Sequence, residues 1–370
     1  MLCVVRDVLA QKHSLWEGLN PGPYSVGFKV FNERDNSRSY RPKRDYQGNP
    51  DFREHARPIQ ISIWYPARPA ANASPLPFAA YVHLIPAERD FRKLTKEKEL
   101  ESERSFMAIP LARGASEAKL RSLMKMATTG FKDAPPQAGA FPLVVVGQGL
   151  GFESPITHAA MGEYLASHGY IVATSPLTGA YSSFVKLDLI DLEAEVRDME
   201  FVISSVRALP NVDPNKLGLI GFDLGGMSAL LLQMRNGDVD AVVSLDSGIA
   251  FEHNTKLLKQ SPYYNPSRLR VPLLHATATR EEIEASGAHE DLSLFESAVY
   301  ADIYRLRFKG MRHVDFTSDY DAPTLARSED ILSEPSSDGF PEGLLDQPFY
   351  GWVRWRYYDQ PVLTGFPGRL

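Results

Sequence analysis

Two aspartates and one histidine each follow a stretch that is typical of a buried strand. Asp223 follows LGLIGF, Asp246 follows VVSL, and His313 follows YRLRFKGMR. A histidine can accept a proton from a nucleophile or a water, and a carboxylate on its other ring nitrogen fixes the tautomer and stabilises the imidazolium. We therefore expect Asp223, Asp246 and His313 to share one pocket, with Asp246 orienting the imidazole.

The residues around Asp223 predict a strand, a sharp turn and a helix. This turn presents the nucleophile in many hydrolytic enzymes, and the residue at its tip is usually serine. Negative charge that develops during such a reaction needs fixed hydrogen-bond donors. We expect the backbone N–H of Leu224 to be one donor, and that of Leu150, in the glycine-rich loop 147–151, to be the other.

Each of these polar residues has a simpler interpretation. An aspartate at a strand end often caps the following helix, and His313 alone could be a surface histidine. Ser228, Ser247 and His275 are weaker candidates for a catalytic role. Ser228 lies five residues into the predicted helix, and His275 lies inside a predicted strand, where a buried histidine of the core is expected.

The elements that would position these residues alternate between strand and helix. From residue 141 onward, apolar β-type runs are separated by amphipathic segments, and this favours a mostly parallel sheet with helices on both faces. The chain order of Asp223, Asp246 and His313 is that of the α/β-hydrolase fold, with the first member changed. In such sheets reactive groups gather at the carboxyl ends of the strands. The predicted strands are 142–147, 170–175, 217–222, 238–245, 271–278 and 303–310, and the predicted helices are 158–169 and 188–209.

The remaining segments suggest additions to this domain. Residues 59–65 alternate and stop at Pro66, which predicts an edge strand of an antiparallel pair. The expected divisions are a loop-rich segment and edge strand over 1–55, a hydrolase domain over 56–325 with a helical insertion at about 80–135, and a C-terminal extension packed on the domain over 326–370. In the insertion, Leu120, Leu123, Met124 and Ala127 form an apolar stripe, which is interpreted as ordinary packing or, alternatively, as a lid over a substrate or a lipid-facing surface.

Composition narrows the classes of function. The 370 residues carry a formal net charge of −6 without a long basic field, so nucleic acid is not an expected partner. A single cysteine, Cys3, excludes an internal disulfide and a cysteine-rich metal site, and no cofactor or metal is expected. No apolar run could cross a bilayer, so a soluble protein is expected. The compartment and the oligomeric state stay open.

Several motifs resemble the platelet-activating-factor acetylhydrolases, within the wider dienelactone-hydrolase-like group of α/β hydrolases. The matching pieces are GPYSVGF (22–28), ISIWYPA (61–67), PLVVVGQGLG (142–151), EYLASHGYIVAT (163–174), GFDLGG (221–226), SLDSG (244–248) and MRHVDF (311–316). By this resemblance Asp246 is the triad acid, His313 the triad base and Leu150 an oxyanion-hole donor. Asp223 takes the place of the family's nucleophilic serine, and Gln148 stands where relatives usually carry histidine.

The aspartate at the turn leaves three interpretations open. The resemblance implies hydrolysis of carboxylic esters, with a small-molecule ester or lipid-like substrate as the partner. Haloalkane dehalogenases and epoxide hydrolases attack an alkyl carbon with an aspartate at this position, although they usually follow it with tryptophan where this chain has Leu224. Alternatively, the carboxylate occupies the oxyanion hole and pairs with protonated His313, giving a ligand-binding pseudoenzyme by natural loss or by deliberate replacement of serine.

Overall fold

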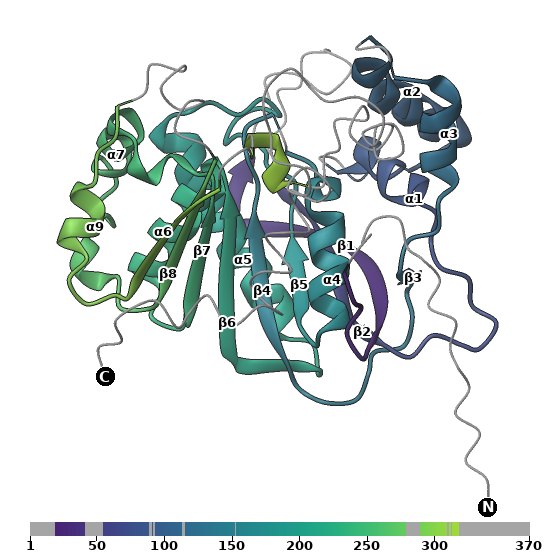
Figure 1. Ribbon diagram of the computed structural model, residues 1–370, viewed down its shortest axis with the longest axis horizontal. Helices are drawn as coiled ribbons and strands as arrows, with labels where there is room; N and C mark the ends of the chain where they lie inside the picture. The colour runs from purple at the N-terminus through teal and green to yellow at the C-terminus, as the bar shows by residue number, and fades with distance from the viewer. Residues whose placement is uncertain are drawn as a thin grey trace, which may run out of the picture.

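A nine-stranded sheet organises the chain. In the computed structural model, which describes residues 19–40, 55–88, 91, 93–112, 115–151, 153–278, 289–308, 311 and 313–317, the strand order is β3-β1-β2-β5-β4-β6-β7-β8-β9 (Figure 1). The strands are β1 Ser25–Tyr40, β2 His55–Ala67, β3 Gly130–Lys132, β4 Phe141–Gly147, β5 Ile171–Thr174, β6 Val212–Phe222, β7 Ala241–Leu245, β8 Leu273–Thr277 and β9 Ile303–Arg307. From β5 to β9 every neighbouring pair is parallel, which confirms the predicted architecture.

Helices cover both faces of this sheet. The α-helices are α1 Ala79–Val82, α2 Lys96–Ala112, α3 Glu117–Lys125, α4 Ala159–Ser167, α5 Leu189–Arg207, α6 Leu224–Arg235, α7 Glu252–Leu258 and α9 Ser293–Ser297. Short 3-10 helices are η2 Ile85–Ala87, η3 Pro155–His158, η4 Gly248–Ala250, η5 Pro266–Arg268 and η6 His313–Phe316. The predicted strands and helices of the parallel part are all present, each with ends that differ by a few residues.

Alternation along β4 divides the core in two. Leu143 and Val145 pack with apolar side chains of α5 and α6, whereas Val144 and Val146 pack with α4 and the segment α1–α3. Successive side chains of a strand point to opposite faces, so a strand covered on both faces is apolar throughout. The continuous apolar run of β4 has this cause.

The N-terminal region differs from the prediction. Residues 25–40, which their polar composition assigned to loop, form strand β1 and pair with β2 in antiparallel register. β2 also pairs with β5, so it is an interior strand, and the prediction that Pro66 marks an edge was wrong. Pro66 is tolerated because the β5 pairing covers only residues 62–64. The domain divisions stay predictions, and 326–370 lies outside the described residues.

The predicted insertion holds α1, α2, α3 and the short strand β3. Leu120, Leu123 and Met124 of α3 are buried in the second core cluster, so the apolar stripe packs inside the protein. Figure 1 shows these three helices together, at the end of the sheet where η6 lies in yellow-green. That end carries the carboxyl termini of the central strands and the residues considered next.

Candidate functional site

The turn at Asp223 has a strained backbone. Asp223 adopts φ 49° and ψ −116° between β6 and α6, a conformation that non-glycine residues rarely adopt. Glycines allow the close backbone approach that this turn requires. A Cβ added at Gly221 would lie 2.1 Å from the carbonyl oxygen of Gly225, which places helix α6 directly against the end of the strand.

Asp223 and the glycine-rich loop are in direct contact. The backbone N–H of Leu150 donates to Asp223 Oδ2 at 2.8 Å. Burial raises the pKa of the Asp223 carboxyl, whereas the charge of His313 and hydrogen bonds from the backbone N–H groups of Leu150 and Leu224 lower it, and the balance is upward. The two N–H groups expected to form the oxyanion hole therefore hold the side chain of Asp223 itself.

His313 and Asp246 form the second half of the cluster. His313 Nδ1 lies 2.7 Å from Asp246 Oδ2, and the other oxygen of Asp246 accepts from the backbone N–H of Ala278 at 2.7 Å. The imidazole stacks on the ring of Phe222, with centroids 4.6 Å apart. The side chain of His313 is 34% exposed and that of Asp246 is 11% exposed, so the acid is buried behind an imidazole that solvent reaches.

The structure thus brings Asp223, Asp246, His313, Leu150 and Leu224 to the carboxyl ends of neighbouring strands. Their geometry allows proton transfer through His313 and the binding of negative charge at Leu150 and Leu224. Within the described residues, no group of three or more His, Cys, Asp or Glu side chains is placed to hold a metal ion. None of the described helices is long and apolar enough to cross a membrane.

The weaker candidates lie elsewhere. Ser228 is buried in α6 and donates to Glu195, while Ser247 and His275 both lie near Ser244 on the face of the sheet that α9 covers. Among the described residues, none of the three forms a hydrogen bond with Asp223. Ser228 belongs to a supporting network rather than to the elbow.

The sequence interpretation missed Glu195, which supports the glycine-rich loop. Glu195 is 4% exposed and accepts from the backbone N–H of Gln148 at 2.9 Å and from the hydroxyl of Ser228. Burial is the main cause that raises the pKa of Glu195 to about 8. The nearby charges of Asp198 and Asp223 also raise it, whereas the hydrogen bonds from Ser228 and Gln148 lower it. Glu195 therefore ties the loop that carries Leu150 to helix α6, which follows Asp223.

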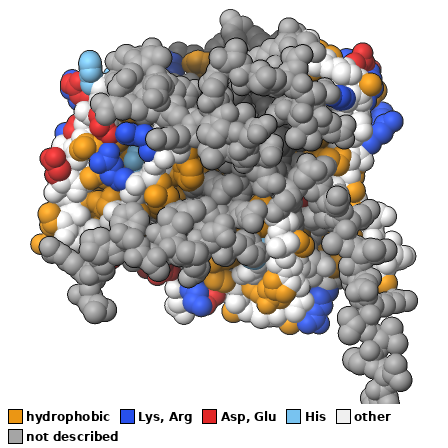
Figure 2. Space-filling view, in the orientation of Figure 1, with side chains coloured by type: hydrophobic (Ala, Val, Ile, Leu, Met, Phe, Trp, Pro, Cys, Tyr) orange, Lys and Arg blue, Asp and Glu red, His pale blue; other side chains and the backbone are white. Residues whose placement is uncertain are grey.

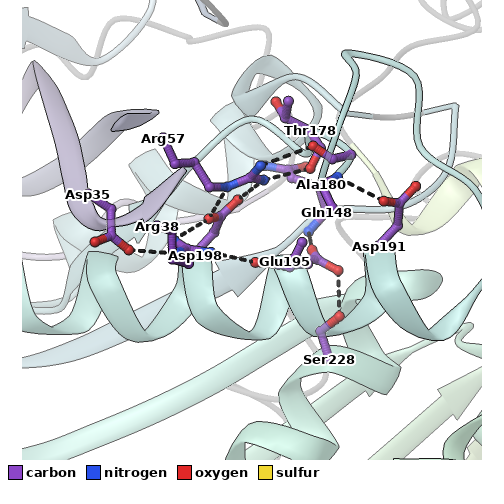
Figure 3. A network of polar contacts seen from close by, with 12 residues as sticks. Asp35, Arg38, Arg57, Gln148, Thr178, Ala180, Asp191, Glu195, Asp198 and Ser228 are labelled. Atoms are coloured by element: carbon purple, nitrogen blue, oxygen red, sulfur yellow. Dashed lines mark hydrogen bonds and ion pairs between the residues drawn. The ribbon is translucent and has the colours of Figure 1, made fainter. Parts of the chain in front are cut away.

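Two further acids of α5 hold a second loop at the same edge. Asp191 accepts from the backbone N–H groups of Ala180 and Lys186, and Asp198 binds the guanidinium of Arg57 (Figure 3). Arg57 in turn donates to the carbonyl oxygens of residues 178 and 179. The sequence could have indicated this network, because the acids at 191, 195 and 198 lie on the helix face that otherwise carries apolar residues, where a buried acid needs a hydrogen-bond partner.

Comparison with known proteins agrees with this architecture. The model of the dienelactone hydrolase family matches residues 129–322. A search of curated proteins found no match. Among solved structures, a ferulic acid esterase from Streptomyces cinnamoneus is 20% identical with a TM-score of 0.60, and the alignment covers 95% of this chain and 96% of that chain. A dienelactone hydrolase-like promiscuous phosphotriesterase from metagenomic libraries is 13% identical with a TM-score of 0.39, covering 77% and 82%. The first likeness shows a shared fold.

Proposed function

Since the chain belongs to the dienelactone hydrolase family and has the α/β-hydrolase fold, we propose that the cluster around Asp223 is a hydrolase active site in which Asp223 is the nucleophile. Asp246 and His313 are the orienting acid and the base, and Leu150 and Leu224 supply the oxyanion hole. The observation that carries this proposal is the hydrogen bond from Leu150 N–H to Asp223 Oδ2. The closer kinship with platelet-activating-factor acetylhydrolases stays a prediction from the motifs.

The occupied oxyanion hole favours attack at an alkyl carbon. If Asp223 attacked the carbonyl carbon of an ester, the oxyanion of the substrate would need the N–H groups that already hold Asp223, and the product would be a reactive anhydride. Displacement at an alkyl carbon places no charge on a substrate carbonyl. It therefore suits a site in which Leu150 holds one oxygen of Asp223 and the other attacks.

The two steps balance as follows. An oxygen of Asp223 bonds to the alkyl carbon, and the leaving group departs with the electron pair of its bond. When the leaving group is the oxygen of a strained ring, the alkoxide that forms takes a proton from water. His313 then takes a proton from a water, the hydroxide adds to Cγ of Asp223, and the charge that develops on Oδ2 meets Leu150 N–H. The Cγ–O bond to the alkyl group breaks, the alcohol leaves with the proton from His313, and the carboxyl of Asp223 releases the proton of the added hydroxide to solvent. Asp246 stabilises the imidazolium between these events.

A second candidate is a binding protein without turnover. The hydrogen bond from Leu150 N–H to Asp223 Oδ2 favours it, because the donor that a substrate oxyanion would need is already occupied. In this alternative the side chain of Asp223 occupies the oxyanion hole permanently, and the pocket binds ester-like or acyl ligands without forming an acyl-enzyme.

Mass spectrometry in heavy-oxygen water distinguishes these functions. The protein is incubated with epoxides, haloalkanes and short aryl esters, and the mass of the peptide that contains Asp223 is measured. Turnover through Asp223 is expected to introduce heavy oxygen into its carboxylate, and His313→Gln is expected to accumulate the alkyl ester of Asp223, whereas Asp223→Asn gives neither. No turnover and no adduct, together with aryl-esterase activity gained by Asp223→Ser, would instead establish the binding protein.

A further inference from the structure

A cavity of about 240 Å³ lies against β8 and β9, and none of its lining residues belongs to the Asp223 cluster. His275 and Thr277 of β8 face Arg305 and Arg307 of β9 in parallel register, so all four side chains point to the same face of the sheet. Phe251 contributes an apolar wall. The cavity is thus a separate concave site at the outer edge of the sheet.

His275 lines this cavity, and one of its ring nitrogens is buried without a partner in the described part of the chain. His275 is 2% exposed, and its Nδ1 lies 3.0 Å from Ser244 Oγ, which in turn lies 2.7 Å from Ser247 Oγ. Its Nε2 has no hydrogen-bond partner among the described residues. Burial lowers the pKa of His275 to about 4, so the ring is neutral and carries one N–H. When Nδ1 accepts from the Ser244 hydroxyl, Nε2–H is a buried donor that an anionic or polar ligand would satisfy.

The rim of the cavity carries a net charge of +1. Arg305 Nη2 lies 2.9 Å from Glu290 Oε1, whereas Arg307 Nη2 lies 3.5 Å from the same oxygen, too far for a strong charge-assisted hydrogen bond. The side chains of Arg305 and Arg307 are each 40% exposed. Figure 2 shows Lys and Arg side chains gathered beside apolar ones on the left of the molecule, the side where Figure 1 shows β8 and α9.

We propose that this cavity binds a small monocarboxylate with an apolar body. The carboxylate accepts from the guanidinium groups of Arg307 and Arg305 and from His275 Nε2–H, while the body lies against Phe251. One negative charge balances the rim, and Glu290 would repel a dianion such as a phosphate monoester. The volume is below that of a typical drug-sized pocket, which limits the ligand to roughly the size of a single ring or a short chain.

Benzoate titration of the full-length chain tests this site. Isothermal calorimetry at low salt is expected to give one saturable site, and nitrogen-15 spectra of the histidine rings are expected to show a shift at His275 Nε2. Arg307→Gln is expected to weaken benzoate binding about tenfold or more. Arg270→Gln is the matched control, because Arg270 is an exposed arginine outside the cavity that contacts Tyr300, and it should leave the affinity unchanged.

Three results would overturn the proposal. Benzyl alcohol binding as tightly as benzoate would show that the charge is not recognised, and phenyl phosphate binding more tightly would exclude the monocarboxylate class. Loss of benzoate binding in Asp223→Asn would place the ligand at the elbow instead. Because the readout is binding at His275, the result is independent of whether Asp223 turns over any substrate, and thermal unfolding of each variant verifies that it is folded.

Discussion

Replacing Glu195 with glutamine tests whether this buried acid is protonated in the folded protein. Burial raises the pKa of Glu195 from its ordinary value of 4.5 to about 8. Both the folded and the unfolded chain bind the proton below pH 4.5, and only the folded chain keeps it between pH 4.5 and pH 8. The contribution of Glu195 to the free energy of unfolding is therefore fully present at low pH and is lost as the pH rises. By pH 8 the loss amounts to about 4 kcal/mol.

Glutamine reproduces the hydrogen bonds of the protonated acid. Its carbonyl oxygen can accept from Gln148 N–H, and its amide can donate to Ser228 Oγ, whose hydroxyl lies 3.3 Å from the carbonyl oxygen of Leu224. Glu195→Gln should then match the wild type near pH 4.5 and exceed its free energy of unfolding by about 4 kcal/mol at pH 8.

Urea unfolding followed by tryptophan fluorescence at these two pH values measures the effect. The difference between wild type and variant isolates Glu195 from other titrating groups. Glu200→Gln is the matched control, since Glu200 lies on the same helix, is 35% exposed and pairs with Arg235. If wild type and Glu195→Gln lose stability in parallel between pH 4.5 and pH 8, the argument that Glu195 is held neutral is refuted.

Three other substitutions test the surrounding network and the site. Asp198→Asn leaves the buried guanidinium of Arg57 without its anion and should cost about 3–5 kcal/mol in urea unfolding, against under about 1 kcal/mol for the exposed control Asp238→Asn; equal losses would contradict this. Gly225→Ala places a Cβ 2.3 Å from backbone atoms of Gly147 at the end of strand β4 and should lower the free energy of unfolding by about 1–3 kcal/mol, and an unchanged midpoint would show that the contact relaxes freely. Asp246→Asn should slow turnover about 10⁴-fold in a steady-state assay while binding persists, and full activity would remove Asp246 from the mechanism.

The parallel part of the fold and the cluster at its edge follow from the sequence. Apolar runs such as LVVV and LGLIGF form strands that are covered on both faces, so a continuous apolar run in the sequence predicts a buried strand of the parallel sheet. Asp223, Asp246 and His313 could be placed together because parallel strands end at one edge and the connections between them are short. Whether this cluster catalyses a reaction stays a prediction that the experiments above address.

Other features depend on partners far away in the chain. Strand β1 carries Arg38, which donates to Asp198 of α5 as well as to Asp35 on its own strand, and no local pattern reveals the pairing with α5. No local pattern reveals the hydrogen-bond partner of Glu195 either, because this partner is the backbone N–H of Gln148, 47 residues earlier in the chain. An acid on an apolar helix face signals that some buried donor exists, but the fold decides which one.

The backbone at the elbow is held by groups that do not depend on the side chain of residue 223. Asp223 N–H donates to the carbonyl oxygen of Leu245, and Gly226 N–H donates to the carbonyl oxygen of Asp223, each at 3.1 Å. These bonds, with the close approach of Gly221 and Gly225, maintain a conformation that costs roughly 1–3 kcal/mol for a non-glycine residue. Serine would inherit the same backbone and leave the N–H of Leu150 available to a substrate. Asp223→Ser therefore changes only which group occupies the oxyanion hole, and a gain of aryl-esterase activity would assign the block in acyl transfer to the Asp223 carboxylate.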